Sequence, residues 1–118
     1  MKELTIVLTS GAMMGTGAYK AVKLAEAALD QGHRVNLFCY GEGITALKKG
    51  QAPKRFPDVS SMISRLIERG MNVAACQTCL KARGYTEGDL IDGAIFGGLS
   101  MQFIEYASRS DRIVHISF

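Results

Sequence analysis

Cysteine, proline and long apolar runs are all scarce in this sequence of 118 residues. It holds 3 cysteines and 2 prolines. An odd cysteine count, with no apolar leader of useful length after Met1, argues against a secreted scaffold built on disulfides. No apolar run approaches the roughly 20 residues that cross a bilayer. We therefore expect a soluble, cytoplasmic protein that makes no membrane contact.

A strong charge of either sign is also lacking. The 14 basic and 11 acidic side chains leave a net charge of +3. No concentrated basic stripe accompanies it, so we expect no direct binding of nucleic acid. One local basic cluster contains Lys48, Lys49, Lys54 and Arg55. Such a cluster is typical of a solvated loop; the alternative is a docking site for an acidic carrier protein or a tRNA-associated partner.

The hydrophobic fraction of 47% is ordinary for a globular protein and excludes disorder as the main state. The length predicts a single domain over residues 1–118. Apolar runs predict strands at 4–8, 34–40, 71–75, 94–96 and 112–116. Helical spacing predicts helices over 18–29, 44–49, 60–69, 76–83 and 99–107. Gly32 is placed to end the helix predicted over 18–29. Asp58 or Ser60 is placed to cap the start of the helix predicted over 60–69.

Strands and helices alternate throughout, and the strand runs are apolar without a period of two. Such strands are covered on both faces. We therefore predict a three-layer α/β/α domain with a five-stranded, mostly parallel sheet. Ligands of such folds bind beyond the carboxyl ends of the strands. The segments expected at that edge are 9–17, 40–42, 76–79, 97–98 and His115.

Cys76 and Cys79 carry the sharpest chemical signal in the chain. A thiol in the first turn of a helix faces unpaired backbone N–H groups, which favour the reactive thiolate. The three-residue spacing places both sulfur atoms on one helix face. Cys79 is equally well explained as a buried structural residue. Four neighbours are expected to support the site, and two of them add positive charge: Gln77, Thr78, Lys81 and Arg83.

Other chemistries of the cysteines fit less well. A structural zinc ion needs four ligands, and Cys39, His33 and His115 are not spaced as a second ligand pair. A thioredoxin-like site would follow the first strand of a different topology. We expect neither a metal nor a cofactor. Cys39 lies inside a predicted strand and belongs to the core, whereas His115 is either a base near the thiols or a hydrogen-bonded, partly buried side chain.

The loop after the first strand is rich in glycine. Gly11, Gly15 and Gly17 do not have the spacing of a dinucleotide fingerprint, although Glu42 follows the second strand where a ribose-binding acid would lie. A plain tight turn explains the loop better. Its backbone amides are candidates for holding a small anion, at Gly11, Gly15, Thr16 and Gly17.

Several apolar side chains are expected at the periphery. Few helices are available to cover two sheet faces in a chain of this length. Met13, Met14, Met101 and Phe103 are the candidates for an uncovered apolar surface. Such surfaces are usually buried in a closed homo-oligomer, which we expect here.

Four segments together resemble the DsrE/DsrF-like family. Residues 32–35 lead into the run 37–43 as in the second-strand region of that family, and Cys76 precedes the pair Arg83-Gly84 as in its active-site helix. The loop 15–17 and the helix segment 25–28 also fit, so the resemblance spans nearly the whole chain. It implies a small α/β protein that forms trimers or hexamers.

The resemblance also implies a function. In the sulfur-relay members of the family, the cysteine that matches Cys76 carries a persulfide and passes its sulfur to a partner thiol. The expected partners are therefore donor and acceptor proteins with reactive thiols. This sequence departs from the pattern at Cys79, a second thiol that is a candidate for resolving the persulfide as a disulfide. The alternative function is a non-catalytic module that binds a small ligand or senses redox state.

Overall fold

The structure is a computed structural model that describes residues 1–117. The five strands are β1 (Glu3–Leu8), β2 (Arg34–Cys39), β3 (Asn72–Cys76), β4 (Ile95–Gly97) and β5 (Arg112–Ile116). All of their pairings are parallel, and the order across the sheet is β4-β3-β2-β1-β5. The predicted α/β fold with its five-stranded sheet is confirmed. Every paired strand is parallel, where the sequence predicted a mostly parallel sheet.

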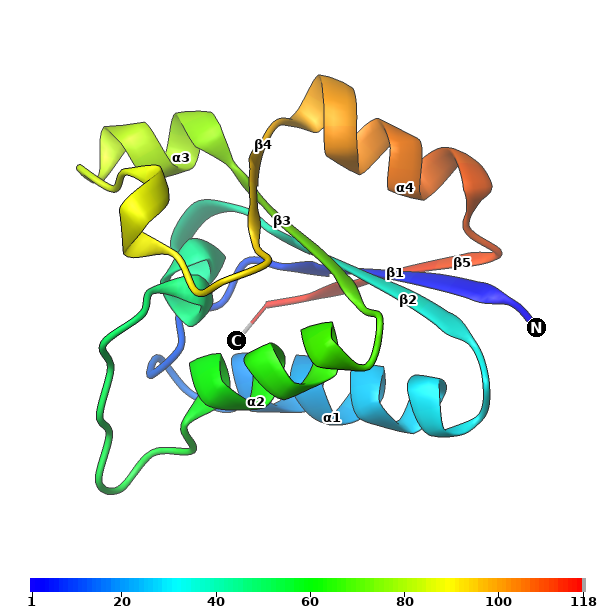
Figure 1. Ribbon diagram of the computed structural model, residues 1–118, viewed down its shortest axis with the longest axis horizontal. Helices are drawn as coiled ribbons and strands as arrows, with labels where there is room; N and C mark the ends of the chain where they lie inside the picture. Colours follow the sequence, from blue (N-terminus) through cyan, green and yellow to red (C-terminus); the bar gives the residue numbers. More distant parts are fainter. Residues whose placement is uncertain (118) are drawn as a thin grey trace.

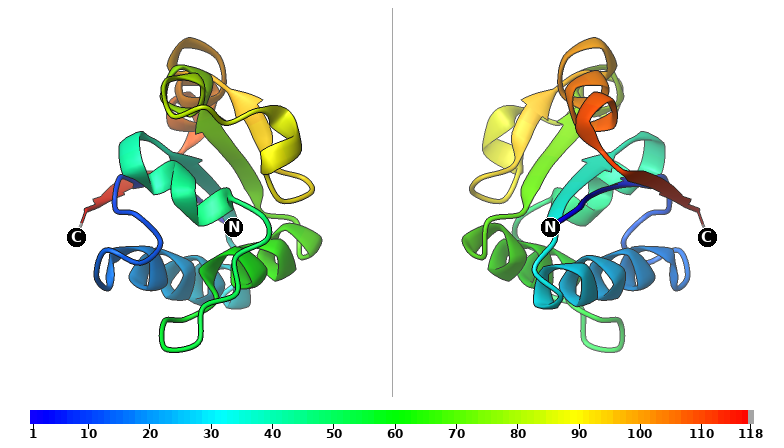
Figure 2. Two further views of the ribbon diagram at one scale, coloured as in Figure 1. Left: turned by 90° about the vertical axis from the view of Figure 1, so that its left-hand side faces the viewer. Right: turned by 90° about the vertical axis from the view of Figure 1, so that its right-hand side faces the viewer.

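Helices lie on both sides of the sheet (Figure 1). The helical segments are α1 (Gly17–Asp30), α2 (Val59–Glu68), α3 (Gln77–Ala82) and α4 (Ile104–Arg109), the 3₁₀-helices η1 (Gly41–Leu47) and η2 (Glu87–Asp89), and the π-helix η3 (Leu99–Phe103). The side views show α1 and α2 below the sheet and α3 and α4 above it (Figure 2). We call these the α1 face and the α4 face.

The helix ends follow from local chemistry. Gly32 adopts a φ of 86°, and the bonds from Gly32 N–H to Leu29 O and from His33 N–H to Ala28 O close α1. At α2 the Asp58 side chain accepts a hydrogen bond from the Ser61 N–H, as the sequence predicted. The segment predicted as a helix over 44–49 is instead the 3₁₀-helix η1, which starts at Gly41.

The two sheet faces differ in what covers them. The α1 face holds the larger core, which includes Ile6, Leu37 and Cys39 with α1 and α2. A smaller cluster on the α4 face contains Phe38, Ala74, Cys76 and Tyr106. At the start of β1, the guanidinium of Arg109 donates to the Glu3 carboxylate over 2.6 Å. This contact connects the end of α4 to the sheet.

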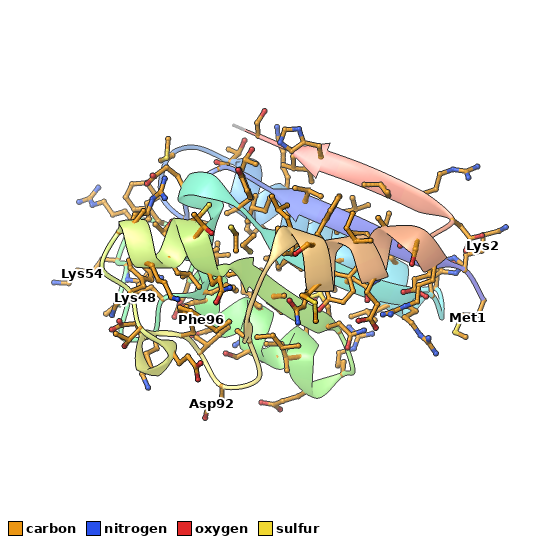
Figure 3. All side chains as sticks on the ribbon, turned by 90° about the horizontal axis from the view of Figure 1, so that it is seen from above. Met1, Lys2, Lys48, Lys54, Asp92 and Phe96 are labelled. Atoms are coloured by element: carbon orange, nitrogen blue, oxygen red, sulfur yellow. The ribbon has the colours of Figure 1, made fainter. Side chains whose placement is uncertain are left out.

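The α4 face is uncovered over β5. Seen from above, none of the helices described over residues 1–117 crosses that strand (Figure 3), and half of the Ile113 surface is exposed. Met13, Met14 and Met101 are exposed as predicted. Phe103 is not a peripheral residue: its ring packs 5.5 Å from that of Phe38, because η3 runs directly into α4 and its last residue lies against the cluster that contains Phe38.

Candidate functional site: two thiols at the carboxyl edge of the sheet

Cys76 is the last residue of β3 and the residue that precedes α3. The sequence predicted it inside the first turn of a helix over 76–83, but its backbone is extended (φ −68°, ψ 117°) and the helix begins at Gln77. Pairing of Cys76 with Gly97 of β4 keeps the residue in the sheet. The side chain is 4% exposed and packs in the cluster on the α4 face.

Cys79 lies one turn further along α3 and is half-buried. The N–H of Gly41, the first residue of η1, donates a hydrogen bond to its Sγ over 3.3 Å. Burial raises the pKa of the Cys79 thiol above its ordinary value, and the adjacent Cys76 thiol raises that pKa further. The Gly41 amide and the Arg83 guanidinium act in the opposite direction, because both favour the thiolate.

The two cysteines form one side of an open pocket of about 320 Å³. Three strand ends contribute to it: β2, the β3–α3 junction, and β4 with η3 (Figure 1). The lining residues are Tyr40, Cys76, Gln77, Thr78, Cys79, Gly98, Leu99 and Ser100. The position agrees with the expectation that ligands of parallel sheets bind at the carboxyl ends of the strands. Gln77 and Thr78 therefore lie where the sequence predicted them.

Arg83 is a cation that acts on the Cys79 thiol, and its guanidinium is paired with the Glu42 carboxylate. Its Nε donates to Glu42 Oε2 over 2.7 Å, and its Nη1 donates to the Cys79 carbonyl oxygen over 3.0 Å. The Glu42 hydrogen bond and charge raise the pKa of Arg83. Lys81 does not line the pocket. The positive charge predicted beside the thiols is therefore largely balanced by Glu42, which the sequence suggested only as a ribose-binding acid.

The sequence did not single out the Gly41 amide or the Arg83–Glu42 pair. The partners lie 38 and 41 residues apart in the chain. A backbone amide leaves no mark in a side-chain pattern. The only available signal was that β2 and β3 would be neighbours, which brings the turn after β2 beside α3.

The glycine-rich loop after β1 forms a separate cavity of about 250 Å³, lined by Gly11, Ala12, Met13, Met14, Glu42, Thr45 and Gln51. Gly15, Thr16 and Gly17 do not line it. Packing explains Gly17, since a Cβ there would lie 2.7 Å from the Ser117 carbonyl oxygen. The anion site in this loop stays a prediction, and the Glu42 carboxylate in the cavity wall disfavours it.

The remaining candidates lie away from the thiols. His115 is on β5, three strand spacings or roughly 14 Å from β3. Its Nε2 hydrogen-bonds with Thr9 Oγ1 over 2.8 Å, so it is not a base for Cys76. Cys39 is fully buried on the α1 face, where burial raises the pKa of its thiol. Within residues 1–117, no three His, Cys, Asp or Glu side chains are grouped as a metal ion would require.

None of the helices described over residues 1–117 combines the length and the apolar character needed to cross a bilayer. The partly buried Lys48 and the exposed Lys54 lie at the end of the molecule opposite Met1 and Lys2 (Figure 3).

Comparison with known proteins gives a consistent result. The model of the DsrE/DsrF-like family matches residues 2–116. MJ0989 of Methanocaldococcus jannaschii is 34% identical over 112 residues, which cover 95% of this chain and 97% of that protein. MK0008 of Methanopyrus kandleri is 32% identical over 111 residues, with 94% and 91% covered.

A solved structure matches the fold closely. The crystal structure of the YchN protein from Escherichia coli superposes with a TM-score of 0.90 at 25% sequence identity, covering 98% of this chain and 99% of that one. Sequence and fold thus agree with the resemblance seen in the four segments of the sequence. The chain belongs to the DsrE/DsrF-like family.

Proposed function

We propose that this protein is a persulfide-carrying sulfurtransferase whose acceptor is Cys76. The observation that carries the proposal is the placement of Cys76 in the wall of the 320 Å³ pocket at the carboxyl edge of the sheet. Family membership supports a fold of the sulfur-relay type.

The reaction needs only a thiolate and two partner thiols. The Cys76 thiolate attacks the outer sulfur of a donor persulfide, the donor S–S bond breaks, and the donor leaves as a thiolate. Cys76 then carries the sulfur as Cys76–S–SH. An acceptor thiolate attacks that outer sulfur, and Cys76 is released as a thiolate. No cofactor is required, because the thiolate itself is the nucleophile.

The pocket suits a transient persulfide. The Cys76 side chain makes no capping hydrogen bond to the first turn of α3, so the N–H groups there are available to an anionic sulfur. Gly98, which also lines the pocket, leaves space, because a Cβ there would meet no heavy atom within 4 Å. The open mouth admits a protein thiol. We propose donor and acceptor proteins with reactive thiols as partners, in the reducing cytoplasm.

Intact-mass spectrometry tests the proposal. The protein is incubated anaerobically with a low-molecular-weight persulfide, and the product is weighed without reductant. We expect a sulfur adduct of about 32 Da on Cys79→Ser, where the second thiol is removed. Cys76→Ser should take up none. A Cys76→Ser protein that gains the adduct as fast as Cys79→Ser would contradict the assignment.

A second candidate function is a non-catalytic module that senses redox state. The observation that favours it is limited access, since Cys76 is only 4% exposed and burial raises the pKa of Cys79. The same measurement separates the two. A sensor forms a disulfide with oxidants and takes no sulfur from any donor, whereas a carrier forms the adduct at Cys76.

A further inference from the structure

Cys76 and Cys79 lie side by side in the same pocket. Both line it, and the Cys79 side chain packs against the cluster that contains Cys76. Residues one helical turn apart are close enough for a disulfide, which needs a Cα–Cα distance of about 4.4–6.8 Å. Cys76 has extended rather than helical backbone angles, so a preceding helical turn does not restrict its side-chain rotamers.

We propose that Cys79 discharges the sulfur held on Cys76 as free hydrosulfide, so that the protein reduces sulfane sulfur with its own two thiols. The substrate class is a low-molecular-weight or protein persulfide, and the product is sulfide. This inference rests on the proposed function, because it begins from Cys76–S–SH.

The step balances without an outside oxidant. The Cys79 thiolate attacks the Cys76 Sγ, the bond between that Sγ and the outer sulfur breaks, and hydrosulfide leaves. In total, Cys76–S–SH and Cys79–SH give the Cys76–Cys79 disulfide and H₂S. The outer sulfur gains two electrons, and the two cysteine sulfurs together lose two. A dithiol reductant then returns the protein to its starting state by exchange.

The environment of Cys79 favours its role as the attacking sulfur. The Gly41 N–H donates to its Sγ, and that contact stabilises negative charge on the sulfur. The Arg83 guanidinium donates to the carbonyl oxygen of the same residue. Cys79 is therefore held by two donors, one on its Sγ and one on its main-chain carbonyl oxygen, while it lines the pocket shared with Cys76. An attacking thiol that is positioned in advance does not have to be brought from solution.

Geometry also selects which sulfur is attacked. The Cys79 thiol interacts with the Cys76 thiol in the same pocket wall, whereas an outer sulfur would extend about 2 Å beyond the Cys76 Sγ. Attack on the inner sulfur expels hydrosulfide into the open pocket. Attack on the outer sulfur would only move the same sulfur to Cys79, which produces neither sulfide nor a disulfide.

The test is a single turnover followed by mass spectrometry and a sulfide assay, without oxygen or added thiol. Cysteine persulfide is supplied in equal amount to the parent protein, Cys79→Ser, Cys79→Ala and Cys76→Ser. The parent is expected to end about 2 Da lighter, as a disulfide, and to release one sulfide per chain. The two Cys79 variants are expected to keep the adduct of about 32 Da and to release none above the Cys76→Ser background.

Two outcomes separate this inference from the proposed function. If the parent keeps a stable adduct like that of Cys79→Ser, the carrier function stands and the sulfide-releasing step is overturned. If no variant gains an adduct and the parent releases no sulfide, the carrier function itself fails. Cys39→Ala is the matched control, since it removes the thiol on the opposite face and should behave as the parent. Circular dichroism confirms that each variant is folded.

Discussion

The backbone N–H of Gly41 donates a hydrogen bond to the Sγ of Cys79 over 3.3 Å, which joins the turn after β2 to the helix after β3. Beside it, Glu42 and Arg83 form an ion pair between the same two elements, with Arg83 Nη2 2.6 Å from Glu42 Oε2. Through these two contacts, the turn at 40–42 is bonded directly to the residues of the thiol pocket and of the end of α3. The reactivity of Cys79 should therefore respond to changes in that turn.

Replacement of Glu42 by Gln is expected to make Cys79 react at lower pH. The Arg83 guanidinium lowers the pKa of Cys79, and Glu42 offsets part of its charge. Without the carboxylate, the positive charge acts more fully on the sulfur, so the thiolate forms earlier. Alkylation rates of Cys79 against pH, read by peptide mass spectrometry, check this. The control is Glu26→Gln, which removes an ion pair with Lys23 on α1; an unchanged profile in Glu42→Gln would count against the coupling.

The three cysteines should differ in alkylation. Cys76 lies at the pocket wall and is expected to react with iodoacetamide faster than either other cysteine. The rate at Cys79 should keep rising above pH 9, because its pKa is raised by burial. Cys39 should remain unmodified until the protein is unfolded, since it is fully buried. Equal native-state rates at Cys76 and Cys39 would contradict the site assignment.

Tyr106→Phe is expected to stabilise the protein. The Tyr106 hydroxyl is buried on the α4 face and has no hydrogen-bond partner within residues 1–117. A buried hydroxyl without a partner costs about 1 kcal/mol or more, which its removal should recover. Urea unfolding measures the change in free energy of unfolding. Tyr19→Phe, at an exposed position on α1, is the control and should change little; a clear loss of stability in Tyr106→Phe would show that the hydroxyl has a partner.

Acid should destabilise the protein through particular carboxylates. Hydrogen bonds to Ser61 lower the pKa of Asp58, and a backbone hydrogen bond from Glu3 N–H lowers that of Asp111. A lowered pKa contributes stability above the unfolded-state value of about 3.9. That contribution is lost as pH falls through the lower folded-state value. Asp111→Asn should therefore lower the melting temperature at pH 7, and the difference from the parent should vanish by about pH 2.

The exposed residue Asp92 offers the control for that measurement. Asp92→Asn should shift the melting temperature less than Asp111→Asn at pH 7. Equal shifts would mean that general charge, and not the hydrogen bond to Glu3 N–H, explains the effect.

The protein is expected to assemble as a homotrimer or homohexamer. Met101, Ile104 and Ile113 expose apolar side chains on this side of the molecule, where no helix in the described part of the chain covers β5. Light scattering at micromolar concentration should give a mass well above the 12.8 kDa of one chain. Met101→Glu is expected to lower that mass while the chain stays folded. Phe103→Glu should instead unfold the chain, because Phe103 packs on Phe38. A parent mass of one chain would end the proposal.

Local sequence determined most of the elements, because their signals lie within a few residues. The apolar runs predicted the strands, and Gly32 and Asp58 marked a helix end and a helix start correctly. The alternation of elements was sufficient for the α/β fold. The same local signals misplaced Cys76 by one residue, because pairing with Gly97 extends β3 up to it. They also missed that Phe103 faces the sheet.

The sequence by itself thus determined the fold class, the edge of the sheet where chemistry would lie, and Cys76 and Cys79 as the residues to examine there. Only the tertiary structure decided what surrounds them. The order β4-β3-β2-β1-β5 places the turn after β2 against α3, and it separates His115 on β5 from the thiols. Hydrogen bonds and ion pairs act over a few ångströms, so partners 38 or 41 residues apart are defined by strand order, which no local pattern encodes.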